Sequence, residues 1–296
     1  MKTKYLIYAS YIIILVFISL TVVFSLSNAQ NQTKNNQHLQ VIRNLSKLRF
    51  ESKIDPSFDQ VPKYYINLDR SKDRNNVMKE EIAKYNVKNI ERFPAVDGRL
   101  LKNVNKGEIN GYTYQVKNKI RFSCIGATLS HLLLIKKIYD LKLDYALIME
   151  DDMHFSLAPY WEKSLQDLIK ETPKDWELLY LTYSNYNPKN KQNVEIEHIT
   201  RDVHGACAYL ISKKGCQKLV NTFFKNNQIV LNVDDPTIDV DILSTANRYL
   251  ATPGYFINQN PFHTSTIEGD YTQGGLQNNL NIVNHYLKKK ELQNEV

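Results

Sequence analysis

The chain has 296 residues, 43% of them hydrophobic and 23% charged, and its formal net charge is +7. These proportions exclude a wholly disordered or collagen-like chain, and the length suits one large domain or two small ones. Three cysteines are too few for a disulfide scaffold and lack the CxxC spacing of a zinc site. Residues 61–296 carry 31 Lys/Arg against 28 Asp/Glu. Because nucleic-acid-binding domains normally carry a clustered basic excess, this near balance predicts no nucleic-acid partner.

The N-terminus predicts a membrane anchor. No charged residue lies between Lys4 and Lys34, and the run Leu6–Leu26 is close to the length of about 20 residues that spans a bilayer as a helix. The positive charges before this run place residues 1–4 in the cytosol and the rest outside it or in a lumen, as in a single-pass type II membrane protein. The alternative is a cleaved signal peptide and a secreted protein, because residues 27–29 (Ser-Asn-Ala) are small enough for a peptidase.

A polar, Asn/Gln-rich stretch follows the apolar run. Its composition cannot bury enough surface to fold alone, and it contains glycosylation sequons at Asn31 and Asn44. The chain therefore divides into a cytosolic tail (1–4), a transmembrane signal-anchor (5–26), a flexible stem (27–60) and a folded domain (61–296).

Beyond residue 60, short apolar runs alternate with longer amphipathic stretches. Strands are expected at residues 64–68, 93–96, 145–149, 178–181 and 206–211. Helices are expected at residues 71–85, 129–142, 158–170 and 212–224, with a loop over 101–122. Ser212 suits the N-cap of the last of these helices, and Asp235 with Pro236 predicts the start of another. This alternation predicts an α/β fold with a mainly parallel sheet.

Three adjacent carboxylates, Glu150, Asp151 and Asp152, end the most apolar predicted strand. The carboxyl ends of strands in α/β sheets face the ligand crevice, and hard carboxylate oxygens there suit Mn²⁺ or Mg²⁺ together with substrate phosphates. A solvated acidic turn is the alternative interpretation.

Other candidates lie at the ends of predicted elements. Asp239 and Asp241 diverge if they lie on a helix, so one of them could act as a general base while the other is exposed. His131 lies near the start of an apolar helix and is either a structural residue or a third candidate for the base. Asn67, Asp69, Arg70 and Arg74 follow the first strand, where a helix N-terminus and guanidinium groups could bind an anion or form a solvated turn.

Taken together, these segments resemble glycosyltransferase family 25 over about residues 61–268. The resemblance is carried by the order of the following motifs: YYINLDRSKDR (64–74), FPAVDGR (93–99), IGATLSHLLLIKKI (125–138), YALIMEDDMHF (145–155), GACAYLISKKGCQKL (205–219), PTIDVDIL (236–243) and NQNPFHTSTI (258–267).

The resemblance implies a GT-A type, Rossmann-like mixed sheet flanked by helices, a UDP-sugar donor, a divalent metal, usually Mn²⁺, and inversion at the anomeric carbon. It implies that Asp151 and Asp152 serve the metal and that Asn67, Asp69, Arg70, Arg74 and Glu150 lie at the donor. Asp239 or Asp241 would match a later acidic motif, and Gln259 and Ser265 a late segment of less certain role. The implied partners are a UDP-sugar, a glycan, lipid-linked or protein acceptor, and the membrane.

The sequence departs from the family at one motif. Where the family usually reads Gly-Glu-x-Gly-Cys, this chain has Cys124 at the Glu position and Ala127 at the Cys position. The departure keeps open a catalytically inactive binding or structural protein on the same fold. The acidic cluster also leaves open a different metal enzyme, such as a phosphohydrolase.

Overall fold

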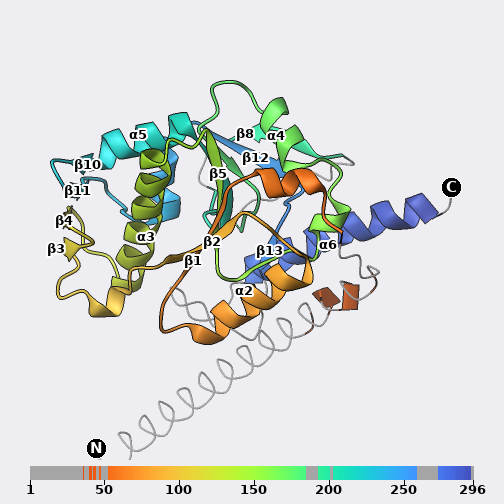
Figure 1. Cartoon of the computed structure of the whole chain (residues 1–296), viewed down its shortest axis with the longest axis horizontal. Helices are drawn as coiled ribbons and strands as arrows, with labels where there is room; N and C mark the ends of the chain where they lie inside the picture. Colours follow the sequence, from red (N-terminus) through yellow and green to blue (C-terminus); the bar gives the residue numbers. More distant parts are fainter. Residues whose placement is uncertain are drawn as a thin grey trace, which may run out of the picture.

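The computed structural model describes residues 36, 40–41, 43–44, 47, 53–184, 193–200, 203–258 and 273–294 (Figure 1). The predicted membrane anchor lies outside these residues, as do Asn31, Gln259 and Ser265. None of the helices in the described part of the chain is long and apolar enough to cross a membrane.

A seven-stranded mixed sheet forms the centre of the domain. Its strands are β1 (Lys63–Asn67), β2 (Ile90–Pro94), β5 (Tyr145–Glu150), β7 (Leu178–Tyr180), β8 (Glu195–His198), β9 (Ala208–Ser212) and β12 (Arg248–Thr252). They lie in the order β2-β1-β5-β9-β7-β12-β8. The pairs β1–β2, β1–β5 and β7–β12 are parallel, whereas β5–β9, β7–β9 and β8–β12 are antiparallel.

The mainly parallel sheet that we predicted is therefore wrong for half of the pairings. Parallel neighbours need a crossover connection, usually a helix. In the described residues between β7 and β9 there is β8 but no helix, so β9 enters between β5 and β7 in the opposite direction.

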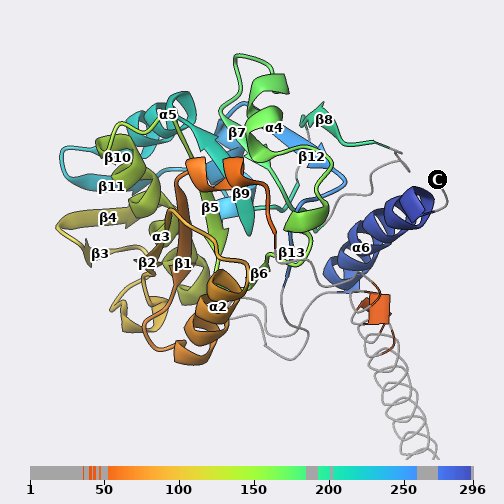
Figure 2. The ribbon, with the colours of Figure 1, turned by 45° about the vertical axis from the view of Figure 1, so that its right-hand side comes forward.

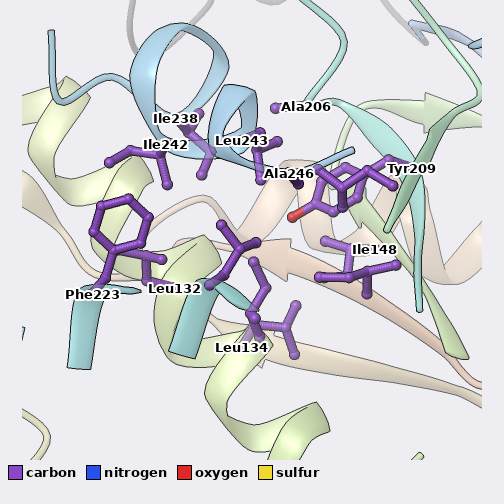
Figure 3. Close-up of a cluster of buried hydrophobic side chains, with 14 of the residues drawn as sticks. Leu132, Leu134, Ile148, Ala206, Tyr209, Phe223, Ile238, Ile242, Leu243 and Ala246 are labelled. Carbon is purple, nitrogen blue, oxygen red and sulfur yellow. The ribbon is translucent and has the colours of Figure 1, made fainter. Parts of the chain in front are cut away.

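Helices cover both faces of the central sheet, so its inner strands β5 and β9 are buried on both sides (Figure 2). Helices α3 (Phe122–Asp140) and α5 (Lys213–Phe223) pack on one face, where Figure 3 shows Leu132, Ile148 and Phe223 in one apolar cluster. The opposite face packs against η1 (Pro56–Gln60), α2 (Lys72–Lys84) and α4 (Leu165–Glu171). Because successive side chains of a strand alternate, Ile148 belongs to the first cluster while Leu147 and Met149 belong to the second.

A second, four-stranded sheet replaces the predicted loop over 101–122. It has the order β10-β11-β4-β3, with β3 (Lys106–Ile109), β4 (Tyr112–Val116), β10 (Phe224–Lys225) and β11 (Gln228–Leu231). The β3–β4 turn is Asn110-Gly111, and both residues have positive φ, at 50° and 79°. Asn-Gly is a strong hairpin signal because a type I′ turn needs positive φ at both positions. Treating the segment as a loop overlooked this turn chemistry.

Two predicted helices also differ from the structure. The helix predicted over 158–170 is divided into η3 (Ala158–Tyr160) and α4, because the backbone is extended at Trp161 and Ser164 caps a new helix through the Asp167 amide at 3.1 Å. Asp235 accepts from the Thr237 amide at 3.0 Å within a turn and caps no helix; the π-helix η4 (Ile238–Ile242) and the 3₁₀-helix η5 (Leu243–Thr245) follow. The predicted N-cap Ser212 is confirmed, since its side chain accepts from the Gly215 amide at 3.2 Å.

A peripheral layer lies beside the central sheet. It contains the two-stranded sheet β6 (Met153–His154) and β13 (Ile257–Asn258) and the helix α6 (Gln273–Asn294). Two residues of the predicted stem, Val41 and Asn44, are buried against this layer, and the Asn44 amide donates to Asn284 at 2.7 Å. This part of the predicted stem is therefore packed on the C-terminal helix.

Candidate active site

The parallel strands β1 and β5 carry the predicted site to one edge of the central sheet. Ile66 is in register with Glu150, so Asn67 and Asp151 leave neighbouring strands side by side. A pocket opens at this edge. Its walls come from the ends of β1 and β5, from residues 95–99 and from the first turns of α3.

Asp151 is the best-connected carboxylate of the site. It is buried, its Oδ2 accepts from Asn67 at 2.6 Å, and its Oδ1 accepts from the Arg74 guanidinium. Burial raises the pKa of Asp151, and the nearby Arg74 charge and the Asn67 hydrogen bond lower it in part. Arg74 also lies 3.7 Å from Asp152, so one guanidinium on α2 serves two adjacent carboxylates.

The predicted donor residues belong to two groups. Asn67 accepts from Arg92 at 2.8 Å, and Arg92 pairs with Asp69 at 2.6 Å. Arg70 instead pairs with Asp97 at 2.6 Å and lines the pocket. Asp69 and Arg70 therefore have different ion-pair partners. Arg92 was missed by the sequence reasoning. No sequence signal identified it, because its contact with Asn67 forms only when β2 pairs with β1.

Glu150 and His131 face each other at the pocket wall. The His131 Nε2 lies 3.7 Å from the Glu150 carboxylate, and Nδ1 lies 3.0 Å from the Tyr209 hydroxyl. His131 is only 1% exposed, whereas the Glu150 side chain is 25% exposed. Burial alone would raise the pKa of Glu150. The nearby His131 ring and the Arg74 charge outweigh burial and hold that pKa below its usual value.

Asp239 and Asp241 contact different segments, as their spacing predicted. Asp239 Oδ1 accepts from the amides of Gly205 and Ala206, at 2.8 Å each. Asp241 accepts from the Asp235 amide at 2.7 Å. Burial raises the pKa of Asp239 despite these two amide bonds. Neither carboxylate is among the residues that line the pocket, whereas His131 and Glu150 are.

Two glycines allow residues 97–99 to pack against the start of α3. A Cβ on Gly98 would lie 1.9 Å from the Phe122 carbonyl oxygen, and a Cβ on Gly126 would lie 2.8 Å from the Gly98 nitrogen. The close approach puts Arg99 and Ser123 on the pocket wall. Ala127 also lines the pocket, whereas Cys124 is buried and does not.

The acidic triplet forms no preassembled metal cage. Among the residues that the structure describes, no group of three His, Cys, Asp or Glu side chains is arranged to hold a metal ion. Both Asp151 oxygens accept protein hydrogen bonds, so Asp152 is the carboxylate best placed for a metal that also binds phosphate and water.

The Arg74–Asp151 contact should contribute strongly to stability, because each partner leaves a buried charge when the other is removed. We expect Arg74→Gln to lower the free energy of unfolding by about 3 kcal/mol and Asp151→Asn by a similar amount. The double variant should lose less than the sum, as measured by urea unfolding. Lys136→Gln is the control: it breaks the exposed pair with Asp140 (2.6 Å) and should cost only about 0.5 kcal/mol. Fully additive losses would show that Arg74 and Asp151 act separately.

Comparison with known proteins agrees with the resemblance. The family model described as glycosyltransferase family 25 (LPS biosynthesis protein) matches residues 60–237. Procollagen galactosyltransferase 2 of Homo sapiens is 30% identical over 176 residues, which cover 55% of this chain and 27% of the human protein. A glycosyltransferase 25 family member of Aedes aegypti is 27% identical over 168 residues, which cover 53% of this chain and 27% of the mosquito protein. The match thus spans about a quarter of the length of these relatives.

Among solved structures, a glycosyltransferase involved in the glycosylation of the major capsid of PBCV-1 has a TM-score of 0.30 and 9% identity, covering 65% of this chain and 92% of its own. This likeness is too loose to assign a fold. The family match spans more than half of the chain and includes Asn67, Arg74, His131 and the acidic triplet. The chain belongs to glycosyltransferase family 25.

Proposed function

We propose that this chain is a membrane-anchored, metal-dependent hexosyltransferase of GT-A type. It transfers galactose or glucose from a UDP-sugar to a hydroxyl of a glycan, lipid-linked or protein acceptor, with inversion. The observation that supports the proposal best is the acidic triplet at the carboxyl end of β5, which meets Asn67 and Arg74 beside a pocket. Family membership supports the transfer of a sugar.

The donor set fits Mn²⁺ or Mg²⁺ bound together with the diphosphate. Such ions use one or two carboxylates and complete their shell with water and substrate phosphates. Asp152 would hold the metal directly, and Asp151 would contribute through its place beside Arg74. The ion would supply positive charge for the departing diphosphate. Arg70 and Arg74 line the same pocket and add guanidinium donors for phosphate oxygens.

We propose the Glu150–His131 pair as the group that receives the acceptor proton. The attacking hydroxyl must lose its proton, and a base has to lie within hydrogen-bond reach of it. Glu150 is partly exposed at the pocket and ionised. Buried His131 faces it with Nε2, and the contact of Nδ1 with the Tyr209 hydroxyl holds the imidazole ring in place. Asp239 instead holds the Gly205–Ala206 turn, and Asp241 holds the loop at Asp235. A single in-line displacement on the sugar then gives inversion.

The metal proposal predicts linked binding. We expect Mn²⁺ to bind the protein weakly alone and more tightly once UDP is present, as measured by titration calorimetry. EDTA should abolish UDP-sugar turnover, and added Mn²⁺ should restore it. Asp152→Asn should weaken UDP and Mn²⁺ binding together and lower turnover by at least about 10²-fold. Asp140→Asn, on the exposed end of α3, is the charge-matched control and should change neither. Full turnover in EDTA would remove the metal role.

The base proposal predicts different turnover for variants of four residues: Glu150, His131, Asp239 and Asp241. Glu150→Gln should lower kcat by about 10²–10⁴-fold while UDP still binds with Mn²⁺. His131→Asn should lower kcat less and shift the acidic limb of the pH–rate profile upward, because the interaction with His131 that lowers the Glu150 pKa is lost. Asp241→Asn should leave kcat nearly unchanged. Asp239→Asn should lower the melting temperature clearly while changing kcat little. If Glu150→Gln turns over normally while Asp239→Asn does not, Asp239 is the base.

The anchor proposal rests on the sequence of residues 5–26. We expect the full chain to stay with membranes after alkaline carbonate extraction, and a chain starting at residue 53 to be released. Recovery of the full chain in the soluble fraction, with its N-terminus at Gln30, would instead identify a cleaved signal peptide.

A further inference from the structure

We infer that the segment between Asp97 and Phe122, here called the rim, binds the acceptor and selects an acidic glycan. The inference rests on the proposed transferase function and adds a substrate class to it. The rim holds six Lys/Arg against two Asp/Glu, a net charge of +4, while residues 61–296 as a whole have a net charge of only +3. The positive excess of the folded domain is therefore concentrated in this one segment. All six basic side chains are exposed.

Arg99 brings this positive charge to the pocket. It lines the same pocket as Glu150 and Asp151, and its side chain has no acidic partner among the described residues. The nearest acid in sequence, Asp97, is already engaged: Oδ2 accepts from Arg70 at 2.6 Å, and Oδ1 accepts from the Arg99 backbone amide at 3.0 Å. The remaining arginines that line the pocket, Arg70 and Arg74, are both paired with carboxylates. Arg99 is thus available for an anionic group of a bound molecule.

Apolar side chains accompany this charge. The exposed large hydrophobic residues of the described chain are Leu100 (81% exposed), Phe122 (43%) and Leu141 (52%). Leu100 and Phe122 adjoin the pocket-lining residues Arg99 and Ser123. An exposed aromatic ring offers an apolar face for a sugar ring, and a guanidinium in the same segment offers hydrogen bonds for polar groups of the sugar.

The fold places the start of the rim in the same pocket as the proposed donor residues. Gly98 and Gly126 allow residues 97–99 to contact the first turns of α3, and Arg99 and Ser123 line the pocket together with Glu150 and Asp151. A molecule bound at Arg99 would therefore share the pocket with Glu150, as an acceptor must. An anionic membrane surface would also attract a basic, apolar-tipped rim. The position of Arg99 inside the pocket favours a substrate instead.

The test compares two acceptor-like probes that share one sugar backbone, one with free carboxylates and one with neutral methyl esters. A trigalacturonate and its methyl ester are titrated into the full chain in detergent, with UDP and Mn²⁺ present, and binding is followed by saturation-transfer NMR. We expect the acidic probe to bind at least tenfold more tightly, with an affinity that falls as salt rises. Arg99→Gln should remove most of this preference, and Arg99→Lys should keep part of it. Lys79→Gln, which removes an exposed charge outside the rim, should leave it unchanged.

Three results would overturn the inference. Equal binding of the acidic and neutral probes would show that the rim does not select charge. Weaker UDP binding by Arg99→Gln, with the acidic probe unaffected, would assign Arg99 to the donor. Displacement of the acidic probe by phosphatidylglycerol added to the detergent micelles would assign the rim to the membrane surface. Failure of the transferase proposal is separate, because it would appear as no UDP-sugar turnover by the wild-type chain, whereas probe binding is measured without turnover.

Discussion

The site depends on neutralising three adjacent carboxylates where a buried strand meets a pocket. Coulomb repulsion among Glu150, Asp151 and Asp152 is strongest at this partly desolvated edge, so each needs a cation or a donor close by. Arg74 serves Asp151 and Asp152, and His131 serves Glu150. Since these partners come from α2 and α3, on opposite faces of the sheet, the acidic edge exists only when both helices are packed. The packing of α2 and α3 on the sheet and the neutralisation of the three carboxylates therefore depend on each other.

The antiparallel strand β9 supplies the residues next to the acidic edge on the other side of β5. Because β9 runs antiparallel to β5, its start rather than its end lies beside Glu150, and the Glu150 amide donates to the Cys207 carbonyl at 2.8 Å. Asp239 fixes the turn just before that start through the Gly205 and Ala206 amides. A carboxylate that the sequence suggested as a base thus holds the strand entry, and Tyr209 of the same strand holds His131.

Local patterns predicted the parts of the fold that local physics determines. The apolar runs of β1 and β5, the Ser212 cap and the acidic triplet were visible because periodicity, capping and charge act within a few residues. The direction of β9 and the Arg92–Asn67 contact were not, because both depend on segments brought together by the sheet. The Asn110-Gly111 hairpin was visible in principle and was overlooked. Averaging charge over residues 61–296 also hid the basic stretch between Asp97 and Phe122, since acidic segments elsewhere cancel it.

The departure from the family motif at α3 agrees with this basic stretch. A Glu at position 124 would place a negative charge in the first turn of α3, where the helix dipole favours anions. With Cys124 there, that turn contains no acidic residue, although Arg121 and Arg99 adjoin it. Cys124 is buried and does not line the pocket, so the change leaves Glu150, Asp151 and Asp152 in place, while the first turn of α3 carries no negative charge. In the proposed assignment, such a change would alter the charge at the acceptor side of the pocket before it altered the groups assigned to the donor.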